Sequence, residues 1–200
     1  MSNLIKRDNL IWEWQNFSDA SQEILQKVLL KENWVYYTNS GGVGENLEDE
    51  TIKGRSTSVW PDEDIYMDVM SIFKECLNEY IEQNSLSIKD SNMDSGRWLF
   101  REYNPGTKLA PHNDAYSYVQ DQGKPVRPVL TILFYLNDDY VGGEIDFPND
   151  NLCIKPKAGS VVIFPSEKIH SVLEMFSGKR YMTQTYVYER EYTSYDQIWK

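Results

Sequence analysis

The chain contains two histidines, His112 and His170, and acidic and basic residues stand at fixed distances from them. Asp114 lies two positions after His112, and Arg180 lies ten positions after His170. Enzymes that activate oxygen with non-haem Fe(II) hold the metal by two imidazoles and one carboxylate, which leaves other coordination positions open. His112, Asp114 and His170 are therefore candidate ligands of one metal ion.

The His-x-Asp spacing is weak when it stands alone, because 31 of the 200 residues are Asp or Glu. A single histidine is also more often a hydrogen-bonded structural residue than a ligand. The candidate triad therefore depends on the elements that would position it.

Two helices are predicted in the N-terminal half of the chain. Ser18 or Asp19 can cap a helix that ends near Lys31, with apolar residues at three- and four-residue spacing. Pro61 suits the start of a second helix, whose apolar face continues to about residue 84. The polar, glycine-bearing residues 38–60 between them predict a long loop.

From Trp98 onward, short runs of aromatic and β-branched residues alternate with turn signals, a pattern typical of an all-β sandwich or barrel. The expected strands cover residues 97–103, 129–136, 144–147, 160–164, 168–175 and 180–188. The predicted fold class is an all-β core with flanking helices, a double-stranded β-helix (jelly roll, cupin-like) with the N-terminal helices packed on one sheet. We expect a single domain over residues 1–200, with residues 1–95 as a mainly helical support and residues 96–190 as the jelly-roll core.

Alternation along the predicted strands separates the residues that face the helices from those that face the interior. In residues 129–136 the apolar side that includes Ile132 and Phe134 should meet the helices, which turns Thr131 and Tyr135 inward. In the last strand, Arg180 and Gln184 share one side. A guanidinium keeps its charge when buried, so an inward Arg180 needs an anionic partner, either a protein acid or a bound carboxylate.

Composition limits the partners of the chain. A net charge of -11 disfavours nucleic acid, and neither a long apolar run nor an export leader is visible, so no membrane partner is expected. Cys76 and Cys153 lack metal-ligand spacing and are interpreted as reduced structural residues, in agreement with a cytoplasmic location. The oligomeric state is left open.

Two motifs surround the first histidine and the strand that follows it. A strand ending in Tyr and Gly (residues 101–106) precedes a Pro-His-Asn-Asp segment at residues 111–114. A strand ending in Tyr-Leu-Asn (residues 134–137) precedes a Gly-Gly-Glu turn at residues 142–144 and then Phe147.

Two further motifs surround the second histidine. A Pro-x-x-Gly turn at residues 156–159 precedes an apolar strand that ends in Phe-Pro, and His170 follows. Val172 and a Gly-x-Arg segment that ends at Arg180 complete the series. Taken in order, the four motifs resemble the Fe(II)- and 2-oxoglutarate-dependent dioxygenase superfamily, specifically its prolyl 4-hydroxylase-like branch. The resemblance covers about 80 residues, from Phe100 to Arg180.

The resemblance implies a role for each candidate residue. His112, Asp114 and His170 would bind Fe(II), and 2-oxoglutarate would fill two of the open positions. Arg180 would bind the far carboxylate of 2-oxoglutarate and Tyr135 would add a hydrogen bond. Tyr103 would reach the co-substrate or close the pocket. The implied reaction uses O2 to hydroxylate a substrate and to convert 2-oxoglutarate to succinate and CO2, with ascorbate in support.

Two residues narrow the reaction that the resemblance implies. Halogenating members replace the metal-binding carboxylate with a small residue, whereas Asp114 is present, which favours hydroxylation. The nucleic-acid demethylase branch usually carries a second arginine six positions after the first, whereas this chain has Tyr186 there.

The substrate is open at this point. The segment after Asp114, with Tyr116 and Tyr118, and the predicted 38–60 loop, with Arg55 and Trp60, are candidate walls of the active site. A peptidyl proline, a free amino acid and another small metabolite fit the sequence equally. Two other classes of protein remain: a jelly roll that binds metal without turnover, and an interaction module that uses Trp12, Trp14 and Trp34.

Overall fold

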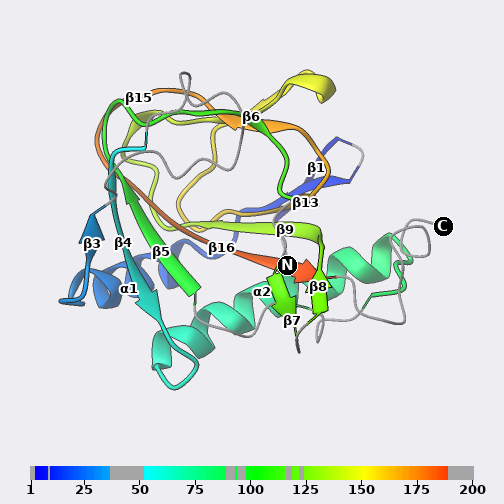
Figure 1. Cartoon of the computed structure of the whole chain (residues 1–200), viewed down its shortest axis with the longest axis horizontal. Helices are drawn as coiled ribbons and strands as arrows, with labels where there is room; N and C mark the ends of the chain where they lie inside the picture. Colours follow the sequence, from blue (N-terminus) through cyan, green and yellow to red (C-terminus); the bar gives the residue numbers. More distant parts are fainter. Residues whose placement is uncertain are drawn as a thin grey trace.

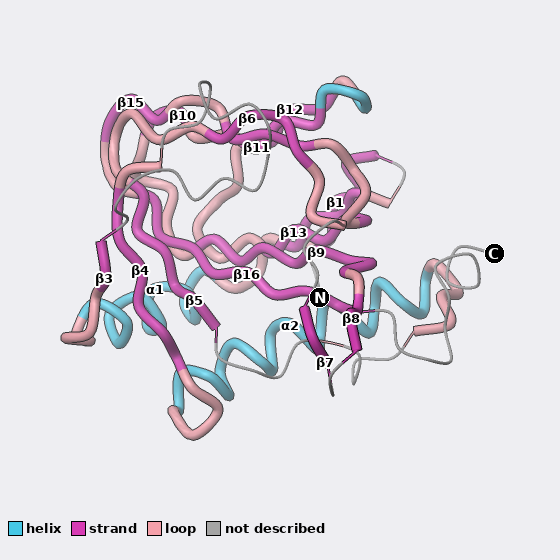
Figure 2. The backbone as a smooth tube through the Cα atoms, viewed as in Figure 1, coloured by secondary structure: helices cyan, strands magenta, loops and turns pink. Residues whose placement is uncertain are grey.

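The computed structural model describes residues 3–8, 10–36, 52–88, 93, 98–115, 119–121 and 124–188, with the backbone alone for residues 119–121 and 124–126. Two antiparallel sheets face each other across the interior, and two helices lie on the outer side of the larger sheet (Figures 1 and 2). This arrangement confirms the predicted jelly roll with helices packed on one sheet.

The larger sheet has eight strands in the order β1-β2-β13-β9-β16-β5-β4-β3, all paired antiparallel. Its strands are β1 (Leu4–Asp8), β2 (Ile11–Trp14), β3 (Val35–Tyr36), β4 (Gly54–Val59), β5 (Trp98–Tyr103), β9 (Pro128–Tyr135), β13 (Val161–Pro165) and β16 (Arg180–Tyr188). The long central strands β9 and β16 line one side of the interior between the two sheets.

The smaller sheet has four strands in the order β12-β11-β14-β6, and two further antiparallel pairs, β10-β15 and β7-β8, form separate two-stranded sheets. These strands are β6 (Leu109–His112), β7 (Val119–Asp121), β8 (Lys124–Val126), β10 (Val141–Gly142), β11 (Ile145–Phe147), β12 (Leu152–Ile154), β14 (His170–Val172) and β15 (Met175–Ser177), and a short 3-10 helix, η3, covers Pro148–Asp150. The smaller sheet lies opposite β9 and β16 (Figure 2).

The helices α1 (Ser18–Leu29) and α2 (Asp64–Gln83) cover the outer face of the larger sheet (Figure 1). The apolar face of α2 is buried against that sheet, where Phe73 contacts the ring of Phe134 edge-on at 6.2 Å between centroids. Burial of such a face is the main source of stability for a surface helix. Both helices were predicted, although α2 begins at Asp64 rather than at Pro61.

Strand β9 divides its side chains as the alternation predicts. Ile132 and Phe134 belong to the core between the larger sheet and the helices. Leu133 and Tyr135 belong to a second core between the two sheets. Thr131 also faces inward, where its hydroxyl binds Asp114, whereas Val129 belongs to the core on the helix side, contrary to the alternation.

The N-terminal region contains more strand than the sequence indicated, because residues before 96 also supply β1, β2, β3 and β4. The predicted loop over residues 38–60 is wrong for Gly54–Val59, which forms β4 beside β5. The residues of β4 are largely polar, so pairing with β5, rather than their own pattern, makes them a strand. Residues 38–51 lie outside the described residues.

Trp12 and Trp14 are buried in β2, 4% and 1% exposed, and so belong to the core rather than to an exposed interaction surface. Cys76 is buried, Cys153 is exposed, and both are free thiols. None of the helices in the described parts of the chain is long and apolar enough to cross a bilayer.

Candidate functional site

The two histidines lie side by side on neighbouring strands of the smaller sheet. His112 ends β6, His170 begins β14, and the two residues pair directly across the antiparallel ladder. Their ring centroids are 4.4 Å apart. The ladder therefore brings together two imidazoles that are far apart in the sequence.

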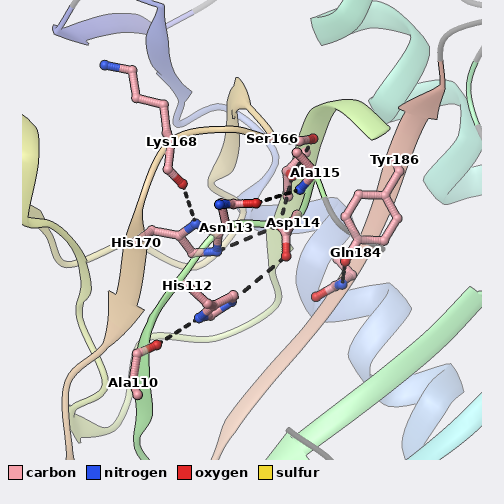
Figure 3. A network of polar contacts seen from close by, with 11 residues as sticks. Ala110, His112, Asn113, Asp114, Ala115, Ser166, Lys168, His170, Gln184 and Tyr186 are labelled. Atoms are coloured by element: carbon pink, nitrogen blue, oxygen red, sulfur yellow. Dashed lines mark hydrogen bonds and ion pairs between the residues drawn. The ribbon is translucent and has the colours of Figure 1, made fainter. Parts of the chain in front are cut away.

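Asp114 reaches the same point from the turn that follows β6. Its backbone N–H donates to the carbonyl of Ser166 at 2.9 Å, and its Oδ2 accepts a hydrogen bond of 2.8 Å from the Thr131 hydroxyl on β9. Asp114 Oδ1 lies 3.8 Å from His112 Nε2, and Oδ2 lies 3.7 Å from His170 Nε2 (Figure 3). The carboxylate is thus held between both rings.

Backbone carbonyls fix the orientation of both imidazoles. His112 Nδ1 lies 2.8 Å from the carbonyl of Ala110, and His170 Nδ1 lies 3.0 Å from that of Lys168 (Figure 3). A carbonyl can only accept, so Nδ1 of each ring donates to its carbonyl, and Nε2 is the ring nitrogen that faces Asp114. Burial lowers the pKa of His170, which favours the neutral ring that a metal requires.

The donor set fits a transition metal with open coordination positions. One atom from each of His112, Asp114 and His170 lies within 4.8 Å of the other two. Two imidazole nitrogens and one carboxylate oxygen suit Fe(II) in the facial arrangement of oxygenases. The hydrogen bonds from Thr131 and to the two carbonyls are the kind of outer contact that orients metal ligands.

Arg180 lies on β16 and is 1% exposed. Its Nη1 donates to the Gly143 carbonyl at 2.7 Å, and its guanidinium carbon lies 4.7 Å from the centre of the Tyr103 ring. Within the described part of the chain, Arg180 Nε has no hydrogen-bond partner and no acid forms an ion pair with the side chain. A buried guanidinium in these surroundings is suited to a carboxylate ligand.

The Gly-Gly-Glu turn positions the carbonyl that Arg180 contacts. Gly142 and Gly143 have φ values of +79° and +69°, which L side chains rarely adopt. An added Cβ would lie 2.0 Å from the Glu174 carbonyl oxygen at Gly142 and 2.8 Å from Met175 Cγ at Gly143. The turn can therefore pack this closely against β15 only with glycines at both positions.

One cavity of about 250 Å³ contains both the triad and Arg180, with Tyr103, Tyr135 and Gln184 among its lining residues. Burial raises the pKa of Tyr135, which keeps its hydroxyl protonated and able to donate. The structure thus brings together all six residues singled out from the sequence: His112, Asp114, His170, Arg180, Tyr135 and Tyr103. Thr131 lies behind the triad, as its inward face predicts.

The expected walls of the cavity need correction. Arg55 does not line the cavity, because it donates two hydrogen bonds to Glu102, and Trp60 is 49% exposed. Ile52, from the same segment, lines the cavity instead. Tyr116 and Tyr118 lie outside the described residues.

Sequence reasoning missed Arg101, which lines the cavity from β5. The alternation of a strand placed Arg101 on the same face as Tyr103, two positions away. The sequence contained that alternation, but it did not reveal that β5 pairs with β16 beside the cavity.

Comparison with known proteins agrees with this geometry. The family model described as the 2OG-Fe(II) oxygenase superfamily matches residues 98–188, which include the triad and Arg180. A PKHD-type hydroxylase of Gluconacetobacter diazotrophicus is 34% identical over 87 residues. That match covers 41% of this chain and 38% of the relative, so the chain spans well under half of the length of that relative.

Two solved structures share the fold. A viral collagen prolyl hydroxylase from Paramecium Bursaria Chlorella virus-1 in a 2OG complex has a TM-score of 0.62 and 18% identity over 92% of this chain and 97% of that one. A prolyl hydroxylase from Trichoplax adhaerens, in complex with a hypoxia inducible factor peptide fragment, has a TM-score of 0.61 and 20% identity over 89% of this chain and 83% of that one. At this identity the two structures show a shared fold alone, and the family match makes residues 98–188 of this chain similar to the 2OG-Fe(II) oxygenase superfamily.

Proposed function

We propose that this protein is an Fe(II)- and 2-oxoglutarate-dependent dioxygenase that hydroxylates an unactivated C–H bond and releases succinate and CO2. The observation that supports this function best is the presence, in one cavity, of an oriented His-Asp-His triad and a buried arginine. A jelly roll that only bound metal would have no chemical use for that arginine.

His112, Asp114 and His170 would hold the metal through Nε2 of each ring and the carboxylate. Bound Fe(II) supplies the activation of O2, which no protein side chain can supply. The chain contributes the orientation of its ligands, since Nδ1 of both rings and Oδ2 of Asp114 already have hydrogen-bond partners.

Arg180 would bind the far carboxylate of 2-oxoglutarate, and the Tyr135 hydroxyl would donate to the same group. The two residues lie on adjacent strands, because Met182 on β16 pairs opposite Tyr135 on β9. Tyr103 packs over the Arg180 guanidinium and would limit its movement. The larger sheet would thus bind the co-substrate, while the smaller sheet supplies both imidazole ligands of the metal.

Neither imidazole would remain for acid-base chemistry, because the chain has only two histidines. Proton movement would use carboxylates, tyrosines, water or the co-substrate instead. The carboxylate at Asp114 favours hydroxylation over halogenation, since a halide would need that coordination position. A peptidyl proline is one candidate target, and a free amino acid or another small metabolite is the alternative.

The test measures succinate released from labelled 2-oxoglutarate when O2 is admitted to the anaerobic protein with Fe(II) and ascorbate. We expect slow uncoupled release from the wild type, none from His170→Ala, and none when a chelator removes the metal. A wild-type protein that binds metal tightly but releases no succinate would show that the oxygenase assignment is wrong. Asp138→Ala, which removes an exposed acid outside the cavity, is the matched control.

A further inference from the structure

The orientation of Arg180 depends on one segment, residues 137–143, which follows β9 and includes β10. Within the described part of the chain, the Arg180 side chain makes one hydrogen bond, from Nη1 to the Gly143 carbonyl at 2.7 Å. The same side chain is 1% exposed. The position of this carbonyl therefore decides how the guanidinium presents its remaining N–H groups to the cavity.

Asn137 attaches the start of this segment to the start of β16. Its Nδ2 donates to the Lys179 carbonyl at 2.6 Å, and its Oδ1 accepts from the Tyr181 N–H at 2.7 Å. These two backbone groups stand on either side of Arg180. Asn137 thus fixes the backbone of Arg180 beside the start of the segment, whereas the Gly143 carbonyl that binds the guanidinium lies at its far end.

Lys155, which directly follows β12, binds the far end of the segment. Its Nζ donates to the Tyr140 carbonyl at 3.0 Å and to the Gly142 carbonyl at 2.7 Å. The ammonium also lies 3.6 Å from the centre of the Tyr140 ring and 3.9 Å from Glu144 Oε1. Hydrogen bonds from an ionised donor are roughly twice as strong as neutral ones, so Lys155 is a strong restraint on these two carbonyls.

Lys155 and Arg180 bind consecutive carbonyls of the segment, those of Gly142 and Gly143. Each peptide group is planar, so only the φ and ψ angles of Gly143 separate the two carbonyls. Gly143 adopts a φ of +69°, and an added Cβ there would lie 3.4 Å from Arg180 Nη1. Glycine has the widest choice of backbone angles, so a restraint on the first carbonyl limits the positions that the second can take.

We propose that Lys155 is a positioning residue for the co-substrate: it fixes the Gly142 carbonyl, and thereby the Gly143 carbonyl that directs Arg180 toward the far carboxylate of 2-oxoglutarate. Lys155 is not among the described residues that line the cavity, so it would act through the segment and not by contact with the ligand. The proposal rests on the dioxygenase function above. It predicts that the affinity for 2-oxoglutarate depends on a residue outside the cavity and that the affinity for Fe(II) does not.

The experiment measures the dissociation constant for 2-oxoglutarate by anaerobic calorimetric titration of the protein loaded with Fe(II). Lys155→Met removes the donors and the charge while keeping a side chain of similar length. The dissociation constant should rise roughly 5- to 20-fold, as for the loss of one or two hydrogen bonds from a charged group. The affinity for Fe(II) should change less than about twofold, because its imidazole ligands come from β6 and β14.

Lys157→Met is the matched control, since the Lys157 side chain is 65% exposed and its Nζ lies 4.0 Å from Asp138 Oδ2. This control should bind 2-oxoglutarate within about twofold of the wild type. A second comparison repeats Lys155→Met in the Arg180→Met protein. If Lys155 acts by way of Arg180, the dissociation constant should then rise by less than about twofold more. A general structural role, or a long-range effect of the charge, would give the same factor in both backgrounds.

If Lys155→Met does not fold, Lys155→Gln, which keeps a shorter and neutral donor, replaces it and should raise the dissociation constant at least about threefold. Three results would overturn the proposal: an unchanged affinity for 2-oxoglutarate in the folded variant, equal losses of affinity for 2-oxoglutarate and Fe(II), or the same factor with and without Arg180. A wild-type protein that does not bind 2-oxoglutarate at all contradicts the dioxygenase function itself, so the two failures are distinguishable.

Discussion

The two ends of the cavity are organised in opposite ways. At the metal end, each of the three ligands has a hydrogen-bond partner that orients it: two backbone carbonyls and the Thr131 hydroxyl. At the other end, Arg180 has one hydrogen bond to the Gly143 carbonyl, and no acid among the described residues forms an ion pair with it. The metal end is oriented by neutral groups, whereas the arginine end is a buried charge suited to an anion.

The difference teaches which ligand each end depends on. Neutral outer contacts tune the affinity for a metal but do not compensate its charge, so Asp114 must supply the negative charge there. The buried guanidinium costs free energy until an anion reaches it, which links the stability of that end to the co-substrate. Changes at the two ends should therefore have separable effects.

The largest effect is expected at the metal end, from Asp114→Ala. Loss of a ligand should weaken Fe(II) binding by more than the roughly 100-fold upper range for outer contacts. Anaerobic calorimetric titration with Fe(II) measures this change, and succinate release should disappear with it. If the Fe(II) affinity of this variant were within a few fold of that of the wild type, Asp114 would not be a metal ligand.

The converse change is Arg180→Met, which replaces the charge by an apolar side chain of similar length. The dissociation constant for 2-oxoglutarate should rise roughly 100-fold, because a buried, hydrogen-bonded charge pair is lost. The affinity for Fe(II) should change less than about threefold. An equal loss of affinity for 2-oxoglutarate and for Fe(II) would show that the two ends of the cavity do not act separately.

The same variant makes a second, opposite prediction for the protein without ligands. Removing a buried charge that lacks an anionic partner should leave the free energy of unfolding unchanged or raise it by about 1 to 4 kcal/mol. Urea unfolding of the metal-free protein measures this, and 2-oxoglutarate with Fe(II) should stabilise the wild type much more than the variant.

Elements with a strong period could be predicted from the sequence, and elements defined by their neighbours could not. The faces of β9 follow from alternation, which placed Thr131 and Tyr135 inward and Phe134 toward α2. Strand β4 is polar and shows no such alternation, so only its pairing with β5 makes it part of the sheet. Its assignment to a loop was therefore wrong.

The candidate site shows the same division. The spacing of His112, Asp114 and His170 could be read from the chain, but their meeting depends on the pairing of β6 with β14, and β6 was not predicted. Arg55 was expected in a wall of the site because it lies in the predicted 38–60 loop. In the structure it binds the buried Glu102 instead, which no local pattern reveals.

A smaller effect is expected from an outer contact at the metal end, in Thr131→Val. This change removes the hydroxyl that donates to Asp114 Oδ2 while keeping the shape of the side chain. Fe(II) affinity should fall roughly 10-fold, the lower part of the range for such contacts, and 2-oxoglutarate affinity at saturating Fe(II) should stay within about twofold. Competition with a coloured chelator measures the Fe(II) affinity.

Thr185→Val is the matched control, because the Thr185 hydroxyl is buried without a hydrogen-bond partner in the described structure. This control should bind Fe(II) as the wild type does. If the affinity for Fe(II) fell by the same factor in both valine variants, the effect would come from packing of the sheet rather than from the hydrogen bond to Asp114.

The smallest effect on either ligand is expected from Glu102→Gln, although Glu102 lies between Arg101 and Tyr103 on β5. Its carboxylate accepts hydrogen bonds from Arg55, Lys179 and Tyr181. Burial alone would raise the pKa of Glu102, but these donors outweigh it and lower the pKa. Fe(II) and 2-oxoglutarate affinities should therefore stay within about twofold, since the cluster does not line the cavity.

The free energy of unfolding should instead fall by about 2 kcal/mol at neutral pH in Glu102→Gln, because hydrogen bonds to a charged group are lost. A carboxyl whose pKa is lower in the folded protein stabilises it above the unfolded pKa of about 4.3. That contribution is lost as the pH falls through the folded value, so the difference between wild type and variant should shrink below about pH 4. Urea unfolding at pH 7 and below pH 4 measures it, and a difference that stayed constant with pH would mean that the charge of Glu102 does not stabilise the sheet.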